Sequence, residues 1–512
     1  MELEKTKSKK GSELKMAEHC GYIVKITELN EHPNAHSLQI ATIFGASVIV
    51  DLSVKIDDIG VYFPIDLQLS EEYCNQNNLT RKLDSEGNNI GGYLDPNKRN
   101  IRAMRFRGSK SEGLYMPLES LKYTGKTKYE VGETIDKIDS HEICCKYIPK
   151  GKSNYPTRKL GNKTRKKKVP IAPLFLEHAN TEQLAYNLDV FRPGDTIEIT
   201  LKMHGTSGRT GYLPTLKGFI HRAPLYTTIA NKQPPKNKIL RKIYDYILNQ
   251  CTPVYDWGYV TGTRRVVLDN FEGGFYGDNS FREEHAKFFE GKLYKGETVY
   301  YEIVGFMNDG TPIMPSVENN KISDKEFSKQ YGKTTIFSYG CSPTGKILKH
   351  GRDDEGRFTI AEKVPISDCY VYRMTITTEE GYVVEYSPDY MRYRCEQIGV
   401  KSVPLLWKGI IPPELSDGLV KSDDFLTQED GSFKEWLLKT PGNYIKDIAE
   451  QYYDGVDPIG KTHVREGVVV RIVNRPRFCA YKHKNFNFKV LESIAKDLAT
   501  EPDIEEAQEL EE

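Results

Sequence analysis

Short alternating runs of apolar and polar residues dominate the first 145 residues of the chain. Four of these runs, GYIVKITEL, LQIATIF, SVIVDL and IGVYFPI, are rich in β-branched and aromatic side chains and are separated by turn residues. Such runs are typical of short β-strands. A polar insertion after them, SEEYCNQNNLTRKLDSEGNNIGGYLDPNKRN, predicts a surface loop. We therefore expect a small β-barrel over residues 17–145, preceded by a disordered tail at residues 1–16.

From residue 171 onward, the pattern changes to strands mixed with helices. The predicted strands are DTIEITLK, GFIHRA, ETVYYEIVGF, KTTIFSYG, CYVYRMTIT, YVVEYS, HVREGVVVRIV and PRFCAYKHK. The predicted helices are LRKIYDYILNQ, FREEHAKFFEG, DYMRYRCEQIG, FKEWLLKTPG and KDIAEQYYDG. This order predicts an α+β domain with antiparallel sheets and flanking helices over residues 171–493.

Composition narrows the class of protein. With 512 residues, 38% hydrophobic and 28% charged, the chain is long enough for several domains, and it is not collagen, a coiled coil or a wholly disordered protein. It has no apolar run long enough to cross a bilayer and no apolar core near its N-terminus that would act as a secretory signal. The nine cysteines form no CxxC pair, which argues against structural zinc. We expect a cytoplasmic, intracellular protein with no membrane partner, and a viral or phage source is consistent with this.

Charge is balanced overall but segregated along the chain. Lys and Arg total 72, as do Asp and Glu. Residues 146–168 contain ten Lys or Arg and no acid, whereas the last residues are strongly acidic. We interpret residues 146–170 as a basic linker, either simply solvated or acting as a strap that contacts phosphates, and residues 494–512 as an acidic tail.

One familiar motif lacks its required setting. GVDPIGKT at residues 455–462 matches the GxxxxGK[ST] phosphate loop. That loop needs a strand before it and a helix after it, so that backbone N–H groups point at phosphates. Here a predicted helix precedes it and a predicted strand follows it. We therefore do not interpret it as a phosphate site.

The strongest chemical signal is the segment TLKMHGTSGR. Its lysine, Lys202, ends a predicted strand, and a lysine amine is a covalent nucleophile once it loses its proton. Gly205 follows three residues later and would let the backbone approach a ligand closely.

Further charged residues lie on apolar strands, where charge is costly unless it is paired or bound. Glu302 and Glu466 are carboxylates of this kind, and Lys482 and Lys484 alternate so that both point to one face. Arg264 precedes all four in sequence, in the segment GYVTGTRRVVL. Two carboxylates and several cations in one pocket would suit a nucleoside triphosphate and its divalent metal.

In this order the segments resemble the motifs of covalent nucleotidyltransferases, specifically the ATP-dependent RNA ligases. Residues 202–206 match KxHGT, Thr263-Arg264 match the next motif, and Glu302 opens the ExxG stretch. Glu466 opens EGxVxR, and residues 482–484 match KxK. The family's usual Phe-Asp of motif IIIa is Tyr372-Arg373 here. The resemblance covers residues 190–493 and implies an adenylyltransferase domain, an ATP-grasp-like ligase fold.

The first domain adds to this resemblance. HPNAHSLQIATIFG, VYFPIDLQLS and MRFRGSKSEGLYMPL resemble a tRNA-binding type of OB fold, and one RNA ligase subgroup carries such a module ahead of its catalytic domain. OB folds bind nucleic acid with basic and aromatic side chains. Arg102, Arg105 and Arg107 alternate along one predicted strand and could line such a face, or could be an ordinary solvated face. Since all pocket motifs lie beyond residue 190, we expect self-adenylylation without residues 1–168.

The resemblance also implies roles for the motif residues. Lys202 would attack ATP and carry AMP, Glu302 and Glu466 would bind Mg²⁺ or Mn²⁺ or orient the lysine, and Lys482 and Lys484 would neutralise phosphate charge. Nucleotide binding would fall to His204, Gly205, Arg264 and Tyr372, with Arg265 and Tyr339 as rivals of the last two.

The implied enzyme is a monomeric ATP-dependent RNA ligase that joins 5′-phosphate and 3′-OH ends, at nicks in an RNA-containing duplex. The alternatives are a DNA ligase, a GTP-dependent capping-type enzyme, and a nucleic-acid-binding protein that has lost catalysis.

Overall fold

The structure is a computed structural model of the chain. It describes residues 19–149, 169–179, 181–221, 235, 237–248, 251–268, 271, 279–322, 324–352, 354–357, 359–415 and 440–498. The predicted tail at residues 1–16, most of the basic linker and the last 14 residues lie outside this part of the chain, as does most of the predicted helix FKEWLLKTPG.

The N-terminal module, residues 19–149, is built from antiparallel strands. One sheet has the order β11-β5-β1-β12 and another has the order β2-β3-β4. Their strands are β1 (Gly21–Lys25), β2 (Leu29–Glu31), β3 (Leu38–Ile43), β4 (Ala46–Asp51), β5 (Ile59–Pro64), β11 (Gly113–Pro117) and β12 (Thr134–Ile135). All four alternating runs of the sequence therefore form strands. Along β1, Tyr22 and Val24 pack into one buried cluster and Ile23 packs into another, as a period of two requires.

Two expectations for this module need revision. The strand pairing within residues 19–149 gives separate sheets and no closed barrel, so the OB-like barrel stays a prediction. The polar insertion is not all loop, because it contains helix α1 (Glu71–Gln76) with Tyr73 and Cys74 buried. Ser70 starts this helix, since its hydroxyl accepts a hydrogen bond from the Tyr73 N–H at 3.0 Å.

The C-terminal module, residues 169–498, contains two larger sheets and confirms the mixed, mainly antiparallel architecture. The first has the order β16-β31-β30-β17-β29. Its strands are β16 (Glu182–Gln183), β17 (Thr196–Lys202), β29 (Leu405–Ile410), β30 (Gly467–Ile472) and β31 (Cys479–Lys484). The second has the order β20-β19-β18-β21-β26-β27, with β28 on β26. Its strands are β18 (Thr206–His221), β19 (Cys251–Gly262), β20 (Val267–Leu268), β21 (Glu297–Gly305), β26 (Ser367–Thr377), β27 (Val383–Glu385) and β28 (Lys401–Ser402).

The helices of this module form largely where the sequence predicts them. They are α3 (Lys238–Leu248), α4 (Ser280–Phe288), α6 (Pro388–Ile398) and α7 (Pro441–Tyr452). Both α6 and α7 begin at a hydroxyl cap followed by proline, which is already set for the first helical turn. The segment KTTIFSYG, by contrast, is strand only at β23 (Thr334–Thr335), and α5 (Lys325–Tyr331) precedes it. Within the described ranges, no helix is long and apolar enough to span a membrane.

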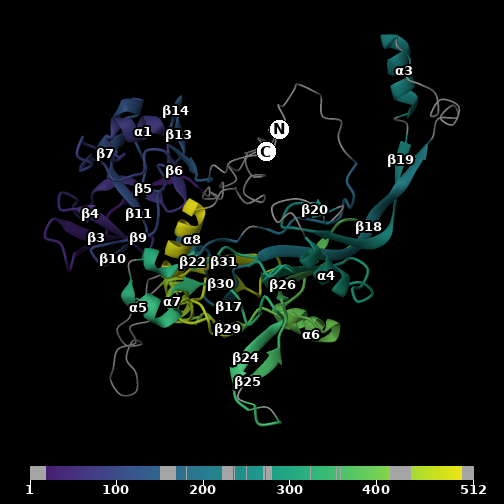
Figure 1. Ribbon diagram of the computed structural model, residues 1–512. Coiled ribbons are helices and arrows are strands. Elements are labelled where there is room, and N and C mark those ends of the chain that lie inside the picture. The colour runs from purple at the N-terminus through teal and green to yellow at the C-terminus, as the bar shows by residue number, and fades with distance from the viewer. Residues whose placement is uncertain are drawn as a thin grey trace.

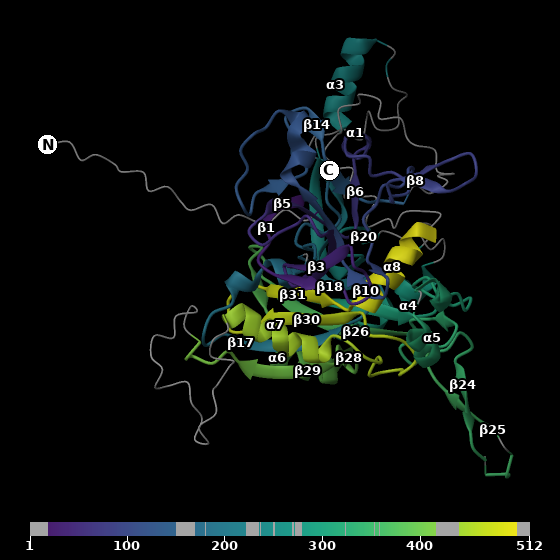
Figure 2. The same ribbon diagram turned by 90° about the vertical axis from the view of Figure 1, so that its left-hand side faces the viewer.

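The final helix, α8 (Phe486–Leu498), was not predicted, and it moves the start of the acidic tail beyond residue 498. Figures 1 and 2 show α8 between the N-terminal module and the sheets of the C-terminal module. The two modules share one buried core, because Ala103 of the N-terminal module packs in the same cluster as Met203, Phe486 and Phe488.

The loop that matches the phosphate-binding pattern lies after α7 and before β30. This is the reverse of the strand–loop–helix order that a phosphate loop needs, so its exclusion on sequence context is confirmed.

Candidate nucleotide site

The segment Met203-His204-Gly205 is the point where the chain crosses from one large sheet to the other. Strand β17 ends at Lys202 in the first sheet, and β18 begins at Thr206 in the second. Lys202 pairs with Gly467 of β30, and Ser207 pairs with Glu302 of β21. The two strand registers therefore place Glu466 and Glu302 on either side of the crossing.

Lys202 forms a close ion pair with Glu466. Its Nζ lies 2.6 Å from Glu466 Oε1, and the lysine side chain is 21% exposed whereas Glu466 is 2% exposed. Lys484 Nζ lies 3.6 Å from the same oxygen but is held more closely by both carboxylate oxygens of Glu492, at 2.8 and 2.7 Å. One buried carboxylate oxygen is thus shared by two lysines.

Burial and charge oppose each other in this cluster. Burial would raise the pKa of Glu466, but Lys202 and Lys484 outweigh it and the pKa of Glu466 is lowered. His204 is different, because burial lowers its pKa to about 4 and the nearby carboxylates only partly offset this. Its imidazole is therefore neutral near pH 7, with Nδ1 at 4.0 Å from Glu466 Oε2.

His204 and Gly205 hold the crossing in place and are not among the residues that line the cavity described below. The His204 ring packs edge-on against Phe337 and Phe488, with centroids 4.7 and 4.8 Å away. The Gly205 N–H donates to Glu302 Oε1 at 3.1 Å. A Cβ on Gly205 would lie 2.3 Å from the Ile303 carbonyl oxygen, so the glycine permits close approach of β21. The prediction that Gly205 also makes room for a ligand stays a prediction.

A cavity between the two sheets collects the other predicted side chains. Lys202 of β17, Glu302 of β21, Tyr372 of β26, and Arg264 from the turn between β19 and β20 all line it. The cavity also distinguishes the alternatives that the sequence left open for the arginine and for the aromatic residue. Arg265 is not among the lining residues, and Tyr339 is buried with its hydroxyl accepting from the His204 N–H at 2.7 Å. The structure therefore favours Arg264 over Arg265 and Tyr372 over Tyr339.

Several residues that line the cavity were not predicted from the sequence as site residues. Among them are His178, Glu198, Arg392, Arg471 and Phe478. The His178 ring lies 5.0 Å from that of Tyr372 and 5.6 Å from that of Phe478. Burial and four nearby arginines, Arg373 foremost, hold the pKa of His178 well below its usual range. Arg471 belongs to the EGxVxR motif, but a lone histidine far from any motif carries no signal in sequence.

Arg373, which follows Tyr372 on β26, has a structural partner. Its guanidinium forms hydrogen bonds to both oxygens of Glu385, one of them at 3.1 Å, and packs over the rings of Tyr300 and Phe478. These contacts fix the strand position next to Tyr372.

The carboxylates suit a divalent metal only together with other ligands. Glu302 lines the cavity, whereas Glu466 lies behind Lys202 with its Oε2 lacking a hydrogen-bond partner within the described chain. The described residues contain no cluster of three or more His, Cys, Asp or Glu side chains that could hold a metal. Triphosphate oxygens and water would have to complete its coordination, as is usual for Mg²⁺.

The two lysines of β31 differ in position. Lys482, Lys484 and the cavity-lining Ala480 alternate along the strand and so share one face, as predicted. His483 points the other way and stacks on Tyr453, with centroids 4.8 Å apart. Lys484 is drawn toward Glu492 and α8. Neither Lys482 nor Lys484 is among the residues that line the cavity.

The predicted arginine face of the N-terminal module does not form. Only Arg105 lies in a strand, β9 (Met104–Phe106), whereas Arg102 precedes it and Arg107 lies in the turn before β10 (Ser109–Ser111) with φ 45°. Arg105 contacts Asp324 at 3.1 Å and Asn487 at 3.1 Å, so it joins the two modules. Arg102 and Arg107 are exposed.

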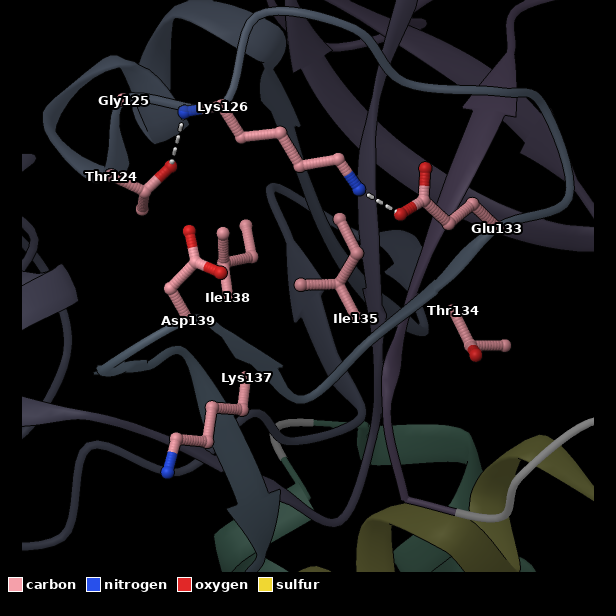
Figure 3. Close-up of a pocket in the computed structure, with 9 residues that line it drawn as sticks. All are labelled: Thr124, Gly125, Lys126, Glu133, Thr134, Ile135, Lys137, Ile138 and Asp139. Carbon is pink, nitrogen blue, oxygen red and sulfur yellow. Dashed lines mark hydrogen bonds and ion pairs between the residues drawn. The ribbon is translucent and has the colours of Figure 1, made fainter.

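Two hollows lie on the N-terminal module. The larger is a groove with five carboxylates, Asp51, Asp57, Asp58, Asp95 and Glu119, and one cation, Arg102, among its lining residues. The smaller is shown in Figure 3, where Lys126 pairs with Glu133 across the pocket. Neither shares a lining residue with the cavity that contains Lys202.

No protein-family model and no curated protein matches the chain. Among solved structures, the chain is similar to a lysine-to-alanine mutant of Naegleria gruberi RNA ligase with ATP and Mn, at 14% identity and a TM-score of 0.48, over 92% of this chain and 98% of that one. A lysine-to-methionine mutant with AMP and Mn gives 14% identity and a TM-score of 0.48, over 93% and 99%. The same ligase with PPi gives 14% identity and a TM-score of 0.47, over 91% and 96%.

Proposed function

We propose that the chain is an ATP-dependent RNA ligase that works through a lysyl-AMP intermediate on Lys202. The observation that carries this proposal is the convergence of Lys202, Arg264, Glu302 and Tyr372 on one cavity. These residues come from four separate motifs, so their meeting is not a consequence of sequence proximity. Arg392 and Arg471 also line the cavity, and cations of this kind suit a triphosphate.

Each side chain has a role in forming the adduct. The deprotonated Lys202 amine attacks the α-phosphorus of ATP, an N–P bond forms, and the P–O bond to pyrophosphate breaks. Glu466, 2.6 Å away, orients the amine. A divalent metal ion held by Glu302 and Glu466 would neutralise charge on the phosphates. Arg264 and Lys482 contact the phosphates, and Tyr372 stacks on adenine, with His178 behind it.

Labelled ATP with Mg²⁺ tests the first step. The wild-type chain should gain the mass of AMP, and Lys202→Ala should not. Lys202→Arg should also fail, because a guanidinium keeps its proton and cannot attack. An adduct on either variant would show that the nucleophile is misassigned. Preference for GTP would indicate a capping-type enzyme, and no adduct on the wild-type chain would indicate a binding protein without catalysis.

We further propose that the substrate is a nick with ribonucleotides on the 3′-OH side. RNA near the nick favours A-form geometry and offers 2′-hydroxyls to the protein, and a deoxyribose end would misplace the attacking oxygen. A misplacement of about 1 Å can cost ~100-fold in rate. Matched nicks that differ only in the sugar on each side test this, and equal sealing of all-DNA nicks would instead indicate a DNA ligase. The OB-like character of the N-terminal module, the domain limits, a monomeric state and a cytoplasmic location stay predictions beside it.

A further inference from the structure

Helix α8 lies between the nucleophile cluster and the N-terminal module. Its start is fixed by Asn485, whose side chain accepts from the Phe488 N–H at 3.2 Å and whose backbone N–H donates to the Glu466 carbonyl at 2.8 Å. The helix therefore begins directly beside the carboxylate that pairs with Lys202.

A stripe of charged residues on α8 holds the N-terminal module. Lys489 pairs with Glu112 at 2.7 Å, and Lys496 pairs with Asp66 at 3.2 Å. Glu492 lies between these two lysines along the helix, at the i+3 and i+7 spacing that places all three on one side. Glu492 itself binds Lys484 through both oxygens.

Acidic and basic side chains alternate in a row from Asp66 to Lys202. Ion pairs join Asp66 to Lys496 at one end, and they join Glu492 through Lys484 and Glu466 to Lys202 at the other. Lys496 acts electrostatically on Glu492, and Asp66 acts on Lys484. Glu492 keeps Lys484 3.6 Å from Glu466 Oε1, which leaves the short 2.6 Å contact to Lys202.

We propose that Glu492 is a positioning residue that holds Lys484 away from Glu466, so that Glu466 can orient Lys202, and that docking of the N-terminal module through Asp66 supports this arrangement. Without the Glu492 charge, Lys484 would move onto Glu466 and compete with the nucleophile for the same oxygen. The proposal rests on the proposed function of Lys202. It also gives the N-terminal module a part in the adenylylation step.

The test measures self-adenylylation of the full-length protein against ATP concentration, together with its melting temperature. Glu492→Gln should lower the maximal rate at least tenfold while the ATP concentration at half-saturation changes little. Glu492→Asp should recover part of the rate, because it restores the charge. Asp66→Asn should give a smaller loss of the same kind. The matched control is Glu112→Gln, which removes the other carboxylate that pairs with the stripe and should keep the wild-type rate.

A double-mutant cycle shows whether Glu492 acts through Lys484. In a Lys484→Met background, Glu492→Gln should cause no further loss, since the lysine that it positions is absent. Additive losses, a wild-type rate for Glu492→Gln, or equal losses in Glu112→Gln and Asp66→Asn would overturn the proposal. If Glu492→Gln does not fold, Asp66→Asn and Glu492→Asp decide it. Failure of the proposed function is a separate result, because the wild-type chain would then form no adduct.

Discussion

The cavity of the C-terminal module and the groove of the N-terminal module are lined by opposite charge. Four cations and two carboxylates line the cavity: Lys202, Arg264, Arg392, Arg471, Glu198 and Glu302. Five carboxylates and one arginine line the groove. A polyanion is attracted to the first and repelled by the second. The difference shows that a module does not bind phosphates merely because it precedes a domain with a nucleotide cavity.

We expect the largest loss of adenylylation when a carboxylate of the cavity is replaced, and no loss when one of the groove is replaced. Glu302→Gln keeps an oxygen that can accept the Gly205 N–H but loses the charge needed at a metal site. We expect adenylylation to fall about 100-fold or more, in line with the loss of one electrostatic contact to a transition state, with an unchanged melting temperature. Glu119→Gln in the groove is the matched control and should adenylylate normally. Equal activities of the two variants would remove the functional distinction between the hollows.

We expect a smaller effect, on ATP half-saturation, when an aromatic residue of the cavity is replaced, and none when one of the groove is replaced. Tyr372→Leu removes a stacking surface in the cavity and should raise the ATP concentration at half-saturation about tenfold, since stacking on a base contributes ~1–3 kcal/mol. Tyr93→Leu removes an exposed tyrosine that lines the groove and should leave ATP use unchanged. ATP titrations of the adduct measure both. An unaltered Tyr372→Leu titration would require another residue to contact the base.

The smallest effect concerns Arg102, the one cation of the groove. A side chain that neutralises a phosphate changes the dependence of log affinity on log salt by about 1 when it is removed. Because carboxylates surround Arg102, we expect Arg102→Gln to leave the salt dependence of RNA binding unchanged. A slope reduced by about 1 would restore the sequence-based prediction that this arginine contacts RNA.

The sequence predicted the cavity better than it predicted the surroundings. Lys202, Glu302 and Tyr372 lie on strongly apolar strands, so the hydrophobic pattern fixes both their strands and the faces that they share. Gly205 marks a limit of sequence reasoning, because close approach to β21 and close approach to a ligand both require a glycine at this position. Only the register of β18 with β21 distinguishes them.

Helix α8 and the positions of three arginines could not be predicted from the pattern of apolar and polar residues. KHKNFNFK alternates at its start like a strand, and only the capping of Asn485 marks the change to a helix. Arg105 and Arg107 are two apart in sequence, but a turn interrupts the strand after Phe106, and Arg102 precedes its start. Contacts between modules, such as Arg105 with Asp324, join residues far apart in sequence that no local periodicity connects. They also weaken the expectation that residues 1–168 can be removed without affecting adenylylation.

The crossing from β17 to β18 limits how proteins of this kind can diverge in length. Three residues join two strands that are held in register in different sheets, and they reach only about 10 Å when extended. An added residue would slip one sheet by one position and turn each of its side chains to the wrong face. The hairpin of β24 (Lys346–His350) and β25 (Thr359–Lys363) projects from the body of the molecule in Figure 1 and carries no such constraint. Insertions and deletions among homologues should therefore collect in this hairpin and be absent from residues 203–205.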